Sequence, residues 1–203
     1  MVIPARDSAN PDAPSPDRLF LKTICDYLEP RRLVTTEIFL SKPIYKPIWI
    51  SVGISVVPNQ SIAVVRDAVR QALRAFLSPL PVATAGAASA AVSAAIDERA
   101  ATGWPLNTPV IRLQLWAVAS RVPGVLQVNG VLLDIDGATL GGIEQVDLSG
   151  LELPQVLGIG VTAGPPLGLE ELRNQTLGSP NADRAPAPGT RRLPVPVILD
   201  ECH

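Results

Sequence analysis

The sequence has few of the residues on which most catalytic and metal sites depend. It contains one histidine, His203, and two cysteines, Cys25 and Cys202, in 203 residues. Two cysteines so far apart do not form the dense disulfide framework of a small secreted protein, so we expect reduced thiols in an intracellular setting. Cys25 then reads as a small buried apolar residue. A histidine at a chain end is a poor catalytic base, and this set of residues is too small and scattered for a zinc site.

Aromatic residues and net charge are also scarce. The chain has 3 Trp, 2 Tyr and 3 Phe, and its 17 basic and 19 acidic residues give a formal charge of -2. Nucleic-acid binding requires a basic excess, so we expect no nucleic-acid partner. A hydrophobic content of 47% excludes a disordered polymer. The core must therefore consist mainly of Ala, Val, Leu and Ile.

No apolar run is long enough to span a bilayer. The longest stretch without charge or proline, residues 82–96, is rich in alanine and shorter than the roughly 20 residues a membrane helix needs. Residues 1–16 lack the basic and apolar segments of a signal peptide, so we expect no membrane span and no secretion by that route. Prolines are concentrated at both ends. We predict a linker over 1–16, a folded module over 17–164 with an Ala-rich insertion at 82–101, and a Pro-rich tail over 165–203.

Hydrophobic periodicity predicts the elements of the module. A helix runs from a cap at Ser15 to Pro30, and a β-branched segment at 35–40 is typical of a strand. From 48 to 56, large apolar residues occupy the even positions, and Trp49, Ser51, Gly53 and Ser55 lie between them. We therefore expect a strand with one packed face and one small, polar face. Two amphipathic helices follow at 62–77 and 108–122.

The remaining strands complete the predicted fold. Residues 125–135 form either one long strand with a bulge at Asn129-Gly130 or a hairpin that turns there, and residues 156–162 form the last strand. We therefore predict an α+β fold: a two-layer sandwich in which a small antiparallel or mixed sheet is covered by two amphipathic helices, with extended Pro-rich arms at both ends.

Two motif matches point to cofactor or metal chemistry, but their contexts do not fit. Gly158, Gly160 and Ala163 match the dinucleotide fingerprint, yet Pro165-Pro166 opposes the helix that must follow it, so a strand is the better interpretation. Asp134, Asp136 and Gly137 resemble the start of a calcium loop, but the later ligands are missing, which favours a turn. We predict no catalytic residues, no cofactor and no metal, and hence a protein that is not an enzyme.

Several motifs occur along the chain in a fixed order. They are Phe20-Leu21, Ile24-Cys25 and Leu28, then 32–38, 43–52, 76–79, Gly103-Trp104-Pro105-Leu106, 122–125 and 153–161. Together they resemble the C-terminal part of the baseplate J-like family, the baseplate assembly proteins of contractile injection systems and phage tails. The resemblance spans about residues 17–164. The sequence departs from the family at the Ala-rich segment 82–101, at Leu106-Asn107 where the family commonly has Phe-Gly, and in length, since family members are usually several times longer.

The resemblance implies a structural role in the baseplate wedge, linking the central hub and spike to the sheath. The implied partners are a second wedge protein, sheath-initiating and hub or spike proteins, and further copies around a six-fold axis. The implied location is the bacterial cytoplasm during assembly and then the particle. The alternative is a stand-alone protein-binding adaptor module without enzymatic activity. Interfaces often use aromatic anchors, so Tyr45, Trp49 and Trp104 are candidate interface residues; alternatively, they fill the local core.

Overall fold

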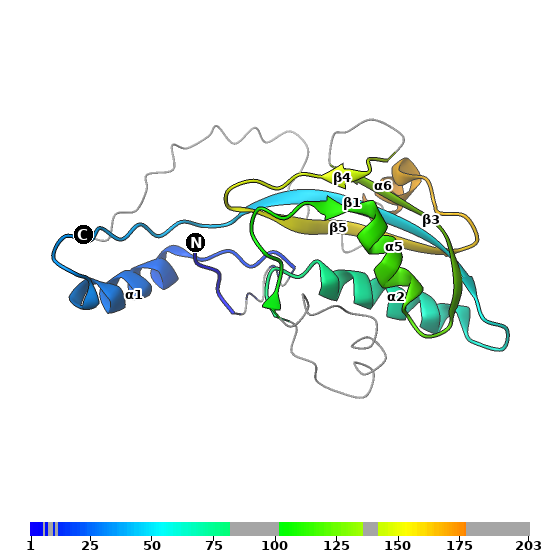
Figure 1. Ribbon diagram of the computed structural model, residues 1–203, viewed down its shortest axis with the longest axis horizontal. Coiled ribbons are helices and arrows are strands. Elements are labelled where there is room, and N and C mark those ends of the chain that lie inside the picture. Colours follow the sequence, from blue (N-terminus) through cyan, green and yellow to red (C-terminus); the bar gives the residue numbers. More distant parts are fainter. Residues whose placement is uncertain (6, 8–9, 11, 82–101, 136–141, 178–203) are drawn as a thin grey trace. The chain divides into compact units, whose positions relative to one another are not determined.

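The computed structural model describes the chain except for residues 6, 8–9, 11, 82–101, 136–141 and 178–203 (Figure 1). Two compact units divide it, the first containing Met1–Ile44 and the second Tyr45–Ser179. The predicted insertion at 82–101 and most of the predicted tail lie outside the described residues.

The first unit contains the predicted helix, with a different cap. Helix α1, Arg18–Leu28, begins after Asp17, whose Oδ1 accepts a 2.7 Å hydrogen bond from the Phe20 N–H. The cap is therefore Asp17 and not Ser15; a side-chain oxygen three residues before the N–H that it accepts from is the usual cap geometry. A short 3-10 helix, η1 (Glu29–Arg31), follows. Cys25, on α1, is disulfide-bonded and half-buried, so the expectation of a reduced, buried thiol is wrong. Cys202 lies outside the described residues.

The predicted strand at 35–40 does not form. This segment has only an isolated bridge at Phe39, which is 47% exposed, and Val34 just before it is 97% exposed. Strand propensity reflects packing on a half-buried sheet surface, and a β-branched segment without such a surface gains little from extended pairing.

The second unit is built on a three-stranded sheet in the order β3-β1-β5. These strands are β1 (Ile44–Val56), β3 (Val125–Ile135) and β5 (Glu152–Ala163). β1 and β3 are antiparallel, and β1 and β5 are parallel. Two contacts at the ends of these strands agree with this direction: the Gly164 N–H donates to the Ile54 carbonyl at 2.8 Å, and the Thr162 hydroxyl donates to the Val52 carbonyl at 3.5 Å. The predicted α+β fold with a small mixed sheet is therefore confirmed.

Two helices cover one face of this sheet (Figure 1). They are α2 (Ile62–Phe76), which packs against β5, and α5 (Arg112–Ser120), which packs against β3. The alternating apolar residues of β1 supply the sheet side of this core. The fully buried positions shared by strand and helices include Ile48, Ile50, Val52, Ile54, Val69, Leu73, Leu115 and Val118.

The second helix begins later than predicted. Val110 and Ile111 form strand β2 (Val110–Ile111), which pairs with β4 (Gln145–Val146) through Val110 and Val146. Pairing with a strand that is distant in the sequence thus removes the first turn from the helix that we expected to start at Thr108. Ile62, which we expected in the buried stripe of α2, is 49% exposed because it lies in the first turn, at the helix end.

Residues 125–135 form a single strand with a bulge, which decides between the two sequence interpretations. Gly53 lies opposite Gly130, but Ile54 lies opposite Val128, so Asn129 is the extra residue. Its side chain is held on both sides: Oδ1 accepts from the Ser55 hydroxyl at 3.1 Å, and Nδ2 donates to the Gly164 carbonyl at 2.8 Å. The bulge thus links the end of β1 to the segment that follows β5.

That segment, residues 164–166, crosses the second face of the sheet, and we call it the strap. A Cβ on Gly53 would lie 2.4 Å from the Gly164 oxygen and 2.5 Å from the Pro166 nitrogen, and one on Gly130 would lie 3.1 Å from the Pro166 ring. The small residues that we expected on a solvent-facing surface are thus covered. Ser51, on this face, is 0% exposed, which corrects the prediction of a polar outer face.

A third helix, α6 (Leu169–Leu177), continues the cover beyond the strap. Leu169 and Leu172 form a buried cluster with Trp49, on the face of the sheet opposite α2 and α5 (Figure 1). Gly160 of β5 leaves room for Leu172, whose Cδ1 would lie 2.9 Å from an added Cβ. We did not predict this helix, because the prolines that begin at Pro165 made the region look like a tail.

Substitution of Gly53 by alanine tests the contact between β1 and the strap. The added methyl group meets backbone atoms at 2.4–2.6 Å, which cannot move aside as a flexible side chain can. We expect Gly53→Ala to lower the free energy of unfolding by about 2–3 kcal/mol, the usual range for overpacking. Gly168→Ala is the matched control, since an added Cβ there meets nothing within 4 Å. Denaturant unfolding of both variants measures the difference, and equal stabilities would contradict the close contact.

Candidate protein-interaction surface

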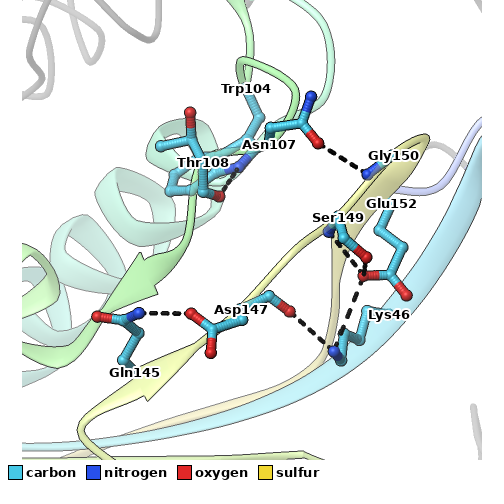
Figure 2. A network of polar contacts seen from close by, with 9 residues as sticks. All are labelled: Lys46, Trp104, Asn107, Thr108, Gln145, Asp147, Ser149, Gly150 and Glu152. Carbon is cyan, nitrogen blue, oxygen red and sulfur yellow. Dashed lines mark hydrogen bonds and ion pairs between the residues drawn. The ribbon is translucent and has the colours of Figure 1, made fainter.

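A polar network holds the corner that leads into α5 (Figure 2). The Trp104 indole N–H donates to the Thr108 carbonyl at 3.1 Å, and Asn107 Oδ1 accepts from the Gly150 N–H at 2.7 Å. Asn107 has φ 55° and Gly150 φ 60°, so both occupy the left-handed region that these residue types tolerate. The corner is thereby tied to the turn before β5, which sets where β2 and α5 begin.

The same turn is anchored to the start of β1 (Figure 2). Lys46 Nζ donates to the Asp147 carbonyl at 2.8 Å and lies 3.9 Å from Glu152 Oε2. Glu152 accepts from the Ser149 N–H at 2.9 Å and from the Ser149 hydroxyl at 3.3 Å. The backbone hydrogen bond from Ser149 is the main cause that lowers the pKa of Glu152, with the Lys46 charge acting in the same direction against a desolvation effect.

A buried ion pair fixes α6 to the second face of the sheet. Arg173 donates to Asp134 at 3.0 Å and to the Ile135 carbonyl at 2.9 Å, and its guanidinium lies 5.7 Å from the centre of the Trp49 ring. The Asp134 side chain is 3% exposed, so Arg173 is the charge that balances it. Asp134 therefore lies inside β3 and not in the turn that we predicted. Asp136 and Gly137 lie outside the described residues.

Polar atoms also remain unsatisfied around this pair. Among the described side chains, Trp49 Nε1, Ser51 Oγ and Arg173 Nε are buried without a hydrogen-bond partner. No group of three or more His, Cys, Asp or Glu residues in the described part of the chain is arranged to bind a metal ion. We interpret the cluster as the attachment of α6, because its central ion pair joins that helix to β3.

Two of the candidate interface residues lie in the core of the second unit. Trp104 is 4% exposed and stacks edge-on against Phe76, with ring centres 5.5 Å apart and planes at 87°. Trp49 is 5% exposed beneath α6. Tyr45 is half-buried near the start of β1. Both tryptophans thus pack as the alternative interpretation describes.

Among the aromatic residues of the second unit, the accessible one lies on α5. Leu113 is 73% exposed and Trp116 is 38% exposed, one turn apart on the side of the helix away from Leu115 and Val118. The sequence does contain a signal for this surface. Apolar residues occur on every side of α5, whereas a helix that covers a sheet needs only one apolar side. We call Leu113 and Trp116 the α5 patch.

The glycines of the fingerprint match lie inside a strand. Gly158 and Gly160 belong to β5, and the chain continues from it into the strap, with no helix starting at that turn. Gly160 is needed for the approach of Leu172, as the strand interpretation expected for close packing.

Comparisons with known proteins give no family. No protein-family model matches the sequence, and no curated protein is significantly similar to it. Within the described residues, no helix combines the length and hydrophobicity that crossing a membrane requires.

The contrast between Trp104 and Trp116 tests whether burial governs their roles. Trp104→Ala leaves a cavity beside Phe76 and an unpaired Thr108 carbonyl, and we expect a loss of about 3–5 kcal/mol in unfolding free energy. Trp116→Ala, at a 38% exposed position, should cost about 1 kcal/mol or less. Chemical denaturation measures both, and a Trp116 variant as unstable as the Trp104 variant would show that the α5 patch is part of the core.

The Glu152 carboxylate predicts a pH dependence of stability. Its folded-state pKa is lowered, so its contribution is complete above the unfolded-state pKa of about 4.3 and is lost as the pH falls through the folded-state value. We expect Glu152→Gln to be less stable than the wild type at neutral pH and to approach it in acid. Unfolding curves from pH 2 to pH 7 measure this, with Glu37→Gln, at an exposed site in the first unit, as control. A constant difference across this range would contradict the assignment.

Proposed function

We propose that this chain is a structural component of the baseplate wedge of a contractile injection system or phage-tail-like particle, where it links the central hub and spike to the sheath. The ordered set of motifs that resembles the baseplate J-like family carries the proposal. In this role the chain acts by holding neighbours in place and not by catalysis.

The packing of those motifs supports the proposal. Two of them, 76–79 and 103–105, lie far apart in the sequence and meet at one corner. The Trp104 ring stacks on Phe76, the Trp104 backbone N–H donates to the Ser78 carbonyl at 2.9 Å, and a Cβ on Gly103 would lie 2.6 Å from the Pro79 oxygen. Because these two motifs pack against each other, a change in one affects the other, which supports reading them as parts of one set.

The α5 patch supports an assembly role more directly. A tryptophan on a helix surface is the residue type most often responsible for interface energy, and Leu113 beside it extends the apolar contact. We infer that a neighbouring subunit covers this patch in the particle.

Electron microscopy of particles from the native source tests this function. We expect density for this chain at six symmetry-related positions between the spike and the sheath. Particles without the chain, or purification of the chain as a soluble one-to-one complex with a single partner, would contradict the wedge and favour the adaptor alternative.

A variant of the α5 patch tests which surface makes the contact. We expect Trp116→Asp to fold normally and to enter particles about tenfold less efficiently or worse, because loss of an interface hot spot typically costs about 2 kcal/mol or more. Val64→Asp is the matched control, since Val64 is 67% exposed on α2 and lies outside the patch. Equal incorporation of both variants would exclude the α5 patch as the contact.

A further inference from the structure

The outer edge of β5 presents an unpaired row of backbone groups. β5 is the last strand of the sheet order, and its even-numbered residues are directed at β1, as the bond from the Gly164 N–H to the Ile54 carbonyl shows. The N–H and C=O groups of the odd-numbered residues are therefore directed away from the sheet. Within the described residues no strand pairs with this edge.

One contact limits the free part of the edge. Arg66 of α2 donates from Nε to the Val161 carbonyl at 2.6 Å, so the row is already occupied near the C-terminal end of β5. The odd residues that lie between Pro154 and Val161 are Gln155, Leu157 and Ile159. Leu157, in the middle, is 38% exposed, although its neighbours Pro154 and Ile159 are buried.

This edge lacks the features that usually prevent strand pairing. Sheet edges are commonly protected by charged side chains, by prolines that remove outward N–H groups, or by short strands. β5 runs from Glu152 to Ala163, and no charged residue occurs between residues 153 and 169. Its one proline, Pro154, occupies an even position, where the missing N–H would face β1 and not the outside. The free edge is thus long, uncharged and able to pair.

We propose that the β5 edges of two copies of this chain pair antiparallel about a two-fold axis at Leu157. In that register Leu157 faces Leu157 of the second copy, and Gln155 faces Ile159 in both directions. Each of these three residue pairs exchanges two backbone hydrogen bonds, about six in all, and the contact leaves the Val161 carbonyl to Arg66. The two sheets then form one continuous sheet.

The chemistry of the edge favours a second copy over other strands. An antiparallel two-fold contact uses the same surface on both chains, so it requires self-complementarity and closes as a dimer. An uncharged strand meets this condition, because no like charges face each other in the pair. The opposite edge of the sheet is already engaged, since the Leu133 carbonyl of β3 accepts from the Ile143 N–H at 2.7 Å, which disfavours open-ended growth through both edges.

A cross-linking experiment on the purified full chain tests the register. Residues facing each other in a hydrogen-bonded antiparallel pair have Cα atoms about 5.5 Å apart, within the range that a disulfide spans. We expect Leu157→Cys to give a covalent dimer under mild oxidation. Val64→Cys, exposed on α2, is the control and should give no covalent dimer under the same conditions. The substitution removes only a partly exposed side chain, so the fold should survive it.

Sedimentation velocity over a range of concentrations tests the interface itself. We expect the wild type to associate reversibly to a dimer, and Leu157→Lys, which puts two charges face to face, to weaken the association at least tenfold. Gln155→Pro removes an outward N–H that β1 does not use and should also weaken it, whereas Val64→Lys should not. A wild type that remains monomeric at all concentrations, or a dimer that neither forms the Leu157→Cys cross-link nor responds to Leu157→Lys, would overturn the proposal.

These measurements need no particle, so their outcome is separate from that of the baseplate proposal. A dimer through β5 could occur in a wedge or in an adaptor, and a monomer would leave the role of the α5 patch untouched.

Discussion

The close passage of the strap over Gly53 is the contact on which the second unit depends. The carbonyl of Gly164 and the nitrogen of Pro166 approach β1 so closely that no side chain fits at position 53. The Pro166 ring likewise limits the space for a side chain at position 130. The strap carries the chain from the end of β5 over the second face of the sheet to α6. Without it, α6 could not reach Trp49, and the second face would present Ser51 and Trp49 to water. A feature made of three residues thus turns a two-layer design into a sheet with cover on both faces.

The bulge in β3 and the strap form one construction. An extra residue in one strand strengthens the local twist and turns its side chain aside. Here that side chain is Asn129, which bonds both to Ser55 and to the Gly164 carbonyl. Both backbone groups of Gly164 thus have partners, because its N–H donates to the Ile54 carbonyl and its C=O accepts from Asn129. Polar residues on this face therefore hold a covering segment in place.

One end of the sheet and the outer edge of β5 differ in chemistry. The end carries the polar network that holds the fold, and the edge carries groups that can contact other chains. At the end where β1 and β5 begin, Lys46, Glu152 and Asn107 form the network that fixes the corner at Trp104 (Figure 2). Along the outer edge of β5, residues 153–163 carry no charge of their own, and Arg66 of α2 bonds near the C-terminal end, at the Val161 carbonyl. The rigid corner positions α5 with its exposed patch, and the uncharged edge offers backbone groups. Both features suit a protein that acts through contacts with other chains.

Local patterns in the sequence were enough to predict much of the fold. The alternation in β1 and the 3.6-residue period of α2 identify a strand and a helix in the right places, because each pattern follows directly from which residues face a core. β1 begins at Ile44, four residues before the predicted strand. The α+β class followed from them. The scarcity of histidine and cysteine, and the near-neutral charge, directed attention to protein contacts. Of the three aromatic residues selected for such contacts, Trp49 and Trp104 are buried in the core and Tyr45 is half-buried.

What tertiary structure alone decided was which surfaces are covered, since coverage depends on residues distant in the sequence. A β-branched segment at 35–40 finds no partner strand, while a pairing between Val110 and Val146 removes the first turn of a predicted helix. Asn129-Gly130 has the composition of a hairpin turn, but the antiparallel register with β1 makes it a bulge. Trp49 and Trp104 are buried by α6 and by Phe76, neither of which is their neighbour in the chain. Periodicity by itself determined which residues can face a core, and only the folded chain determined which of those faces are covered.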